Sequence, residues 1–489
     1  EAMDANTSGS ANVAVGYRTL DANTTGENNV AIGQSALGAS STGDGNTAVG
    51  KNCLDANTTA DNNTAVGLNA LGANTTGAAN TALGRNALLA NTTASNNTAV
   101  GVNAMDTNTT GTSNVAVGQS ALNANTTADN NTAVGYHSLL VNTTGASNVA
   151  LGMQSLVSNT TASNNTAVGY QAAQLNTTGT ENVAVGRLAL NQTTTASYNT
   201  AIGTNALQAN TTGANNTALG RSALTASTTA ANNVAVGKNA GLAVTTGANN
   251  TFMGALAGDA TDDGHSNVAV GYSALSANCG YENTAVGINA LISTTGIYNT
   301  SVGSGAGFDI TSGDNNTCIG QGAGNTGNPG GAITTADNRI ALGDDAVTHI
   351  YAQVQTISSS DERDKTDFTP LDLGLDFVKA LAPVTYKWDK RSKYGDKTAE
   401  GYDLTAQTPD GTHKEDWLDV GFTAQAVEAL ENAAGYSTDT NTNLIYDINP
   451  DGKSMGLQYT KLIPVLVRAI QEQNALIEAL TARVTTLEG

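Results

Sequence analysis

The chain has 489 residues, of which 54 are glycine, 4% are aromatic and 12% are charged, about half the usual charged share. So few large side chains exclude a conventional thick core over most of the length, and the low charge argues against disorder. The net charge of −21 disfavours nucleic acid and anionic membranes as partners, and no apolar run approaches the roughly 18 residues that a membrane-spanning helix needs.

The composition changes near residue 330. All six prolines follow residue 328, both tryptophans lie in the last third, and 13 of the 20 Lys and Arg residues follow residue 350. We therefore predict two regions built by different rules, with the first ending at residue 343.

An internal repeat fills the first region, residues 1–343. Its marker is an Asn followed four positions later by a Gly, and it recurs from Asn12 to Asn267 with a period of 17. Two steps that are shorter by one lead to Asn283 and Asn299, a last step of regular length reaches Asn316, and these make 19 copies. A looser copy at 338–343 ends the array. A short exact period of this kind is typical of stacked repeat architectures.

One unit of the repeat, 63–79, is expected to form one coil of a β-solenoid. Thr64, Ala65 and Val66 alternate between two faces as in a strand, and a second short apolar segment follows at 70–71. The stretch at 74–77 is Asn-Thr-Thr-Gly, which is rich in turn-forming residues. We predict two short strands and two turns per coil, and we exclude helix because the helical period is absent.

Stacked identical coils give each side chain its own kind as a neighbour. Val66 should lie between Val49 and Leu83 in an aliphatic ladder, and the marker asparagines should form a hydrogen-bonded ladder along the stack. The recurring Gly permits a positive φ at each corner. At about 4.8 Å per coil, 19 copies would span roughly 90 Å.

A second period runs through the array. The residue after the Thr-Thr pair alternates between Ala and Gly over twelve units, from Ala60 and Gly77 onward to Gly247. A structural unit made of two successive repeats, with two turn types, explains this alternation, and so does a history of duplication. The sequence leaves both open, as it does the handedness of the coil.

These repeats resemble the head repeats of trimeric bacterial adhesins, in which short Asn-x-Ala-Ile-Gly units build a β-roll. They are more similar to the Asn-Thr-Ala-Val-Gly arrays of phage tail fibres. The resemblance implies a shaft or adhesive region within a trimeric fibre.

Other patterns in the repeats have simpler interpretations. We interpret the Asn-x-Thr triplets as turn residues rather than glycosylation sites, and the Thr-Thr pairs as turns rather than an ice-binding face. Asp259, Asp262 and Asp263 with His265 are interpreted as a solvated loop rather than a glycan-cutting site. The three scattered cysteines have neither disulfide nor metal spacing, Cys318 takes a slot that is usually Ala, and we expect no metal or cofactor.

The second region begins with an alternating segment at 350–357, which we predict to be a strand within a connector at 344–359. Four motifs follow in order. They are Ser-Ser-Ser-Asp-Glu-Arg-Asp-Lys at 358–365, Leu-Ala-Pro-Val-Thr-Tyr-Lys-Trp at 381–388, Val-Gly-Phe-Thr-Ala-Gln at 420–425 and Leu-Gln-Tyr-Thr-Lys-Leu-Ile-Pro at 457–464. We expect Trp388, Trp417 and Phe422 to pack in a core.

Together these motifs resemble the intramolecular chaperone domain of endosialidase-type tailspikes and tail fibres. The resemblance implies an α+β domain at 360–489 that trimerises, guides its β-rich fibre into register and then cuts itself off. By motif, Ser360 is the nucleophile and Lys365 its general base, cleavage falls between Ser359 and Ser360, and Asp361 and Arg363 are supporting positions.

The chemistry of this dyad is consistent with control by assembly. A serine hydroxyl is a weak nucleophile until a base takes its proton, and a lysine serves as that base only when its pKa is lowered, for example by burial. Asp364 stands where the family usually has an aliphatic residue, and a carboxylate beside Lys365 opposes its function as a base. An uncleaved trimerisation cap is therefore the alternative.

The end of the chain, 461–488, predicts a coiled-coil helix independently of any family. Apolar residues alternate in steps of three and four, with one Gln in the seam. Ile followed by Leu alone favours two strands, whereas the resemblance implies three, which we expect here. The seam consists of Ile463, Leu466, Ile470, Gln473, Ile477, Leu480, Val484 and Leu487.

The sequence as a whole predicts a mainly β, trimeric virion tail fibre that positions or contacts a glycan or protein receptor on the host surface. Residue 1 falls within a repeat, so we expect attachment to other tail proteins to lie upstream of it. The alternative is a bacterial cell-surface or secreted trimeric adhesin with the same cap. Catalysis on an external substrate is not expected.

Overall fold

A computed structural model of the chain describes residues 1–328, 331–347, 362, 365–395, 402–440, 442–448 and 454–489. It divides into two compact units, Glu1–Thr300 and Ser301–Gly489. Each unit is described by itself below.

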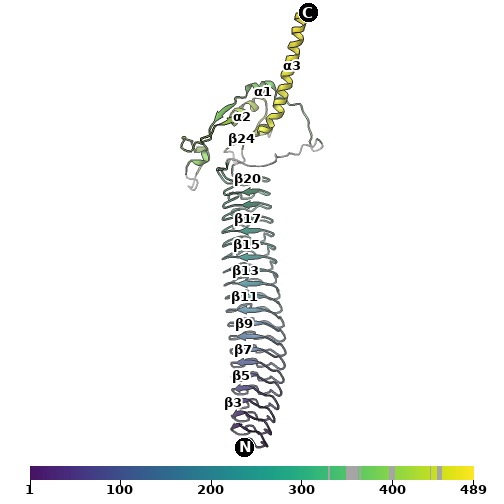
Figure 1. Cartoon of the computed structure of the whole chain (residues 1–489), viewed down its shortest axis with the longest axis vertical. Coiled ribbons are helices and arrows are strands. Elements are labelled where there is room, and N and C mark those ends of the chain that lie inside the picture. The colour runs from purple at the N-terminus through teal and green to yellow at the C-terminus, as the bar shows by residue number, and fades with distance from the viewer. Residues whose placement is uncertain (329–330, 348–361, 363–364, 396–401, 441, 449–453) are drawn as a thin grey trace. The chain divides into compact units, whose positions relative to one another are not determined.

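The first unit is a stack of coils, each carrying one three-residue strand directly after the marker Asn (Figure 1). The next unit of the chain continues this pattern at its start. The coil strands are β1 (Val13–Val15), β2 (Val30–Ile32), β3 (Thr47–Val49), β4 (Thr64–Val66), β5 (Thr81–Leu83), β6 (Thr98–Val100), β7 (Val115–Val117), β8 (Thr132–Val134), β9 (Val149–Leu151), β10 (Thr166–Val168), β11 (Val183–Val185), β12 (Thr200–Ile202), β13 (Thr217–Leu219), β14 (Val234–Val236), β15 (Thr251–Met253), β16 (Val268–Val270), β17 (Thr284–Val286), β18 (Thr300–Val302), β19 (Thr317–Ile319) and β20 (Ile340–Leu342).

Neighbouring coil strands pair in parallel and in register. Val66 of β4 lies opposite Val49 of β3 on one side and Leu83 of β5 on the other, so the predicted aliphatic ladder is confirmed. The register advances by one whole repeat at every step, including the shorter step from Val268 to Thr284. The predicted β-solenoid is therefore confirmed.

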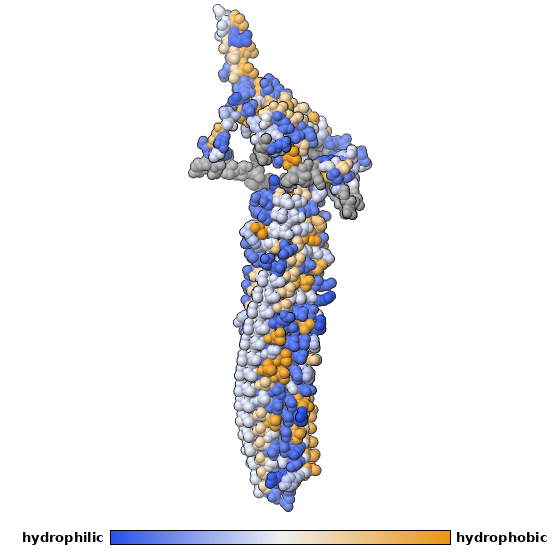
Figure 2. All heavy atoms as spheres, turned by 180° about the vertical axis from the view of Figure 1, so that it is seen from behind, coloured by the Kyte–Doolittle hydropathy of each residue, from blue (hydrophilic) through white to orange (hydrophobic). Residues whose placement is uncertain are grey.

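The core of a coil is thin and made of small residues. Ala65 at the centre of β4 is fully buried, together with Ala70 and Leu71 from the opposite side of the coil. The flanking Thr64 and Val66 point outward, as period-two alternation requires. The aliphatic ladder consequently lies on the outer face. On the face drawn in Figure 2, residues of intermediate hydropathy form a pale band along the coils, beside patches of hydrophobic residues.

The predicted second strand of each coil is wrong. The segment around Ala70 and Leu71 forms turns, because Asn69 and Leu71 both take a left-handed backbone, with φ of 58° and 51°. An L-residue other than Gly rarely adopts this conformation, and it cannot continue an extended chain. These left-handed residues lie in the turns of the coil, and Leu71 stays fully buried in the core.

The predicted asparagine ladder is confirmed. The backbone N–H of Asn63 donates to Oδ1 of Asn46 at 2.9 Å, and Nδ2 of Asn63 donates to the carbonyl of Gly77 at 2.9 Å. The Nδ2 of each marker asparagine therefore bonds within its own coil, and its Oδ1 accepts a bond from the marker asparagine of the next coil. Asn63 is fully buried, so these bonds also satisfy a polar group that burial would otherwise penalise.

A second ladder runs through the asparagine before the Thr-Thr pair. Nδ2 of Asn91 donates to Oδ1 of Asn74 at 2.9 Å and to the carbonyl of Ala94 at 3.0 Å. In the preceding coil Nδ2 of Asn74 makes the same bond to the carbonyl of Gly77, at 2.9 Å. The Gly and Ala variants of the turn thus carry the same hydrogen bonds, and a single repeat suffices to describe one coil.

The corner glycine is required by both conformation and space. Gly67 has a φ of +136°, and a Cβ placed there would lie 2.6 Å from the carbonyl oxygen of Gly84 in the next coil. The backbones of adjacent coils approach too closely at this corner for any side chain. The predicted positive φ is confirmed.

The second unit continues with an α+β domain whose small core contains one residue of α1, one of α2 and two of α3. The core residues are Leu373, Phe377, Val427, Ile445, Tyr446, Leu462 and Val465. The elements are α1 (Leu375–Ala380), β21 (Val384–Tyr386), η2 (Arg391–Lys393), η3 (Leu404–Ala406), β22 (Asp419–Gly421), α2 (Ala424–Ala433), η4 (Thr438–Thr440), β23 (Tyr446–Ile448), β24 (Met455–Leu457), η5 (Tyr459–Lys461) and α3 (Leu462–Glu488). β21 pairs with β22, and β23 with β24, both antiparallel.

The predicted C-terminal helix is present as α3. Leu462, Val465 and Ala469 on one face are buried against the domain, whereas the apolar residues of the predicted seam are between 43% and 84% exposed. The helix therefore has two apolar faces, and the chain covers the first of them. Among the described residues, no helix is both long and apolar enough to cross a membrane.

Candidate functional site in the C-terminal unit

The predicted processing site is only partly described. Ser359, Ser360, Asp361, Arg363 and Asp364 lie outside the described residues, as does the strand predicted at 350–357. The other member of the predicted dyad, Lys365, is exposed in the single chain, and its backbone N–H donates to the carbonyl of Glu362 at 3.2 Å. The Ser360–Lys365 dyad remains a prediction.

Two of the four C-terminal motifs meet in space. Tyr459, from the last motif, accepts a hydrogen bond on its hydroxyl from the backbone N–H of Phe422 at 3.1 Å. The preceding Gly421 is buried, and a Cβ there would lie 2.4 Å from that hydroxyl oxygen. The Val-Gly-Phe motif needs its glycine because the phenol of the last motif occupies the space of a side chain.

A buried carboxylate holds the hairpin β23–β24 against α2. Glu431 of α2 is fully buried, and its oxygens accept the backbone N–H groups of Leu444, Ile445 and Tyr446 at 2.8, 2.7 and 3.3 Å. These bonds satisfy backbone N–H groups that would be costly to leave unpaired where they are buried. Sequence reasoning missed this residue, although an acid four positions after the buried Val427 on an amphipathic helix was an available signal.

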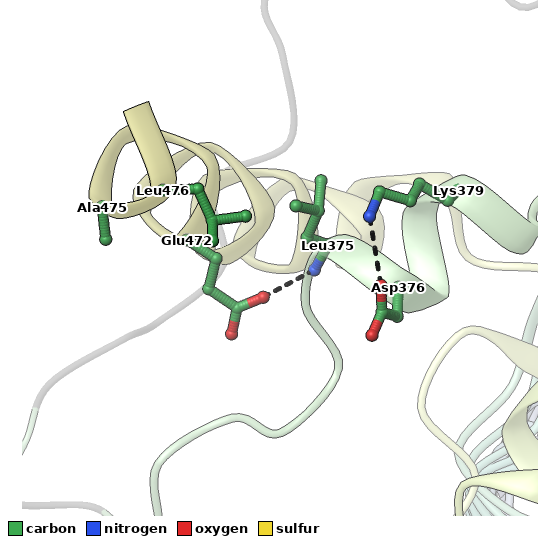
Figure 3. A pocket seen from close by; sticks show the side chains of 6 residues that line it. All are labelled: Leu375, Asp376, Lys379, Glu472, Ala475 and Leu476. Carbon is green, nitrogen blue, oxygen red and sulfur yellow. Dashed lines mark hydrogen bonds and ion pairs between the residues drawn. The ribbon is translucent and has the colours of Figure 1, made fainter. Parts of the chain in front are cut away.

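A second carboxylate joins α1 to α3. Glu472 accepts the backbone N–H of Leu375 at 2.8 Å and the Arg468 guanidinium at 2.8 Å. A Cβ on Gly374 would lie 2.2 Å from Glu472 Oε2, so glycine allows the carboxylate to reach the start of α1. A pocket opens beside this contact (Figure 3), lined by Leu375, Asp376, Lys379, Glu472, Ala475 and Leu476.

The polar residues of this pocket hold α1 against α3 and leave no group poised for catalysis. The Glu472 carboxylate already accepts two donors, and the Asp376 carboxylate pairs with Lys379 at 3.2 Å. The remaining lining is aliphatic. Its six described residues include no pair of nucleophile and base.

The prediction that both tryptophans pack in a core is wrong for the single chain. Trp388 and Trp417 are 44% and 45% exposed, and Val420 of β22 is 70% exposed. The Trp388 indole N–H donates to Asp419 at 3.2 Å. Trp388 and Trp417 lie two residues outside β21 and β22, and no residue of the core cluster belongs to either strand. Phe422, in contrast, packs against the core as predicted.

The cysteines and the acidic cluster of the repeats lie in different surroundings. Asp259 is only partly exposed, whereas Asp262, Asp263 and His265 are exposed as a solvated loop requires. Cys53 and Cys318 are buried in slots that hold Ala in other coils, and burial raises the pKa of the Cys53 thiol to about 12. Asp262 accepts a hydrogen bond from Thr245 of the preceding coil. Over the described part of the chain, no three His, Cys, Asp or Glu side chains are grouped to hold a metal ion.

Comparison with known proteins finds one similar family. Residues 360–436 match the family model described as chaperone of endosialidase, the family that the C-terminal motifs resembled. This family implies trimerisation. Comparisons with curated proteins and with solved structures gave no match. The chain therefore combines a parallel β-solenoid with a C-terminal segment, 360–436, that is similar to the chaperone of endosialidase.

Proposed function

We propose that the chain is a subunit of a homotrimeric virion tail fibre whose coils position or form a surface that contacts a host receptor. Its C-terminal domain is a chaperone that brings three chains into register and then cuts itself off before Ser360. The observation that carries the proposal is the chaperone-family match at 360–436 in a chain whose preceding residues form β-solenoid coils.

The exposed seam of α3 supports assembly through this domain. Its seven apolar residues are 43–84% exposed on the single chain, which is unfavourable unless a partner covers them. A fully buried Leu, Ile or Val contributes about 1.5–3 kcal/mol, so seven of them contribute on the order of 10 kcal/mol per protomer. Gln473 in the seam provides a polar position that can fix the register of the helices.

The outer face of the coil strands supports association along the fibre. The third residue of each coil strand is aliphatic or Met, and these side chains form one ladder along the first unit. Many are more than one third exposed, although a β-face of this kind is ordinarily covered. The exposed members include Val15, Ile32, Leu83, Val134, Ile202, Leu219 and Met253.

The cleavage that we propose is an attack by the Ser360 hydroxyl on the carbonyl carbon of Ser359. The Lys365 amine takes the hydroxyl proton, the Ser359–Ser360 peptide bond breaks, the amine of Ser360 leaves with a proton, and an ester to Ser360 forms. Water then hydrolyses this ester. Lys365 is exposed in the single chain, so a trimer contact that covers it would make the reaction wait for assembly.

Intact mass and light scattering on the purified full chain test the proposal. We expect a trimer and a cleavage product ending at Ser359, which disappears in Ser360→Ala while the trimer persists. Ser358→Ala is the matched control and should still be cleaved. Full-length mass in every sample would refute cleavage and leave a permanent cap.

A second experiment tests assembly through the seam of α3. Ile477→Asp places a charge in the apolar contact and should yield monomers, whereas the neighbouring exposed Glu478→Gln should remain trimeric. A monomeric parent chain, or an Ile477→Asp variant that stays trimeric, would refute assembly through α3.

A further inference from the structure

Three aromatic rings touch on the surface of three successive coils of the first unit. His265, Tyr281 and Tyr298 each precede the marker asparagine of a coil by one or two positions. The rings of His265 and Tyr281 are stacked with centroids 5.0 Å apart, and those of Tyr281 and Tyr298 meet edge-on at 5.3 Å. The cluster coincides with the two coils that are shorter than the others by one residue.

The fold does not require aromatic residues at these slots. The residue directly before the marker takes a left-handed backbone in coil after coil, and Asn occupies this slot most often, as at Asn62 and Asn96. Tyr298 adopts the same conformation, with a φ of 60°. Tyr198 takes the same conformation in another coil, with a φ of 63°, so it is the contact with Tyr281 that distinguishes Tyr298.

The Tyr298 ring is close to half exposed. Its plane lies at 87° to that of Tyr281, whereas Tyr281 and His265 differ by 2°. Tyr298 therefore faces a different direction from the stacked pair, and it is 45% exposed. The edge-on contact with Tyr281 supports this ring, and its exposed part offers an apolar platform.

Two exposed carboxylates belong to the coils that carry the aromatic cluster. Glu282 follows Tyr281 directly, is exposed, and its backbone N–H donates to the carbonyl of His265 at 3.1 Å, which places it on the same corner. Asp263 is exposed two positions before His265. Carboxylates accept hydrogen bonds from hydroxyl groups and repel anions. The chain's net charge of −21 acts in the same direction.

We propose that His265, Tyr281, Tyr298 and Glu282 form a binding site for a neutral pyranose of a surface glycan. The apolar C–H face of the sugar packs on the Tyr298 ring, and its hydroxyls donate to Glu282. This inference rests on the proposed receptor-contacting function and names the class of receptor. Three copies in a trimer would add avidity to a site that is weak by itself.

The test uses the full chain on an array of neutral hexose and N-acetylhexosamine oligosaccharides, beside sialylated and sulfated ones. We expect binding to neutral members, and at least a tenfold loss of affinity in Tyr298→Asn. This substitution restores the residue that other coils carry, so the fold should be kept or stabilised. Tyr198→Asn is the matched control, because Tyr198 is 56% exposed with a φ of 63° in the same slot of another coil; it should bind as the parent does.

Three outcomes would overturn the site. They are the absence of binding to neutral glycans, binding only to sialylated or sulfated glycans, and equal losses in Tyr298→Asn and Tyr198→Asn. None of them alters the mass and light-scattering results that judge trimerisation and cleavage. A trimeric, self-cleaving chain without glycan binding would therefore refute this inference alone.

Discussion

Replacing Ser40 by Asn should stabilise the coils around it. Ser40 takes the place of the asparagine that precedes the Thr-Thr pair in most coils, and it interrupts the second ladder between Asn23 and Asn57. The Ser40 hydroxyl and Oδ1 of Asn23 are both buried and lack a hydrogen-bond partner in the part of the chain that the structure describes. The unsatisfied atoms lie where the ladder is broken.

The magnitude follows from the intact rungs. At Asn91 the amide donates to Oδ1 of Asn74 and to a carbonyl of its own turn, and its Oδ1 accepts from Asn108. Ser40→Asn restores the same three bonds, each worth about 0.5–1.5 kcal/mol net. Ordering the longer side chain costs on the order of 1 kcal/mol. We expect a net gain of about 1–2 kcal/mol.

The assay is hydrogen exchange, because coil stability is local in a repeat array. Amides of the coils that contain Asn23, Ser40 and Asn57 should exchange about 5- to 30-fold more slowly, and distant coils should be unchanged. Ser40→Ala is the control: it removes the unpaired hydroxyl but leaves Oδ1 of Asn23 unsatisfied. If Ser40→Asn protects no better than Ser40→Ala, the ladder does not contribute as argued.

Two further substitutions test the corner glycine Gly67 and the buried carboxylate of Glu431. Gly67→Ala should destabilise its coils by more than about 2 kcal/mol, because a side chain at this φ is strained and its Cβ would overlap the Gly84 carbonyl. If the amides at this corner exchange at the same rate as in the parent chain, this prediction is wrong. Glu431→Gln replaces one acceptor oxygen by a donor that faces backbone N–H groups, and should cost the C-terminal unit about 2–3 kcal/mol. Trp388 and Trp417 both lie in that unit, so tryptophan fluorescence during thermal unfolding reports it, with the partly exposed Glu428→Gln as a control that should unfold as the parent does.

The repeat region could be predicted in detail because its period is exact. Once Asn63 recurs at a fixed interval, stacking places it on Asn46, and the register of Val66 follows without further information. The failure at Leu71 has a local cause. A leucine in a left-handed backbone is unfavourable by itself, and it is imposed by closing a short coil around a core too thin for two strands.

The C-terminal unit was less predictable because its contacts are not periodic. The sequence motifs correctly placed Gly421 and Tyr459 in one domain. They did not predict that the Tyr459 hydroxyl fills the space beside Gly421. Glu431 resembled any other acid on a helix, since its three backbone donors come from positions 13 to 15 further along the chain. The exposed tryptophans show a different limit, because hydrophobicity predicts burial without saying whether the cover comes from the same chain.

The amides of the second ladder all point the same way. From Asn74 to Asn176 each Nδ2 donates to the Oδ1 of the coil before it, so this row has a donor end and an acceptor end, like the two ends of an α-helix. Strand edges of this kind are templates for another chain. A fragment cut anywhere within the coils would expose a face complementary to the opposite end of a second fragment. Such fragments should polymerise end to end, in proportion to their concentration, whatever the sequence of the coil at which they were cut.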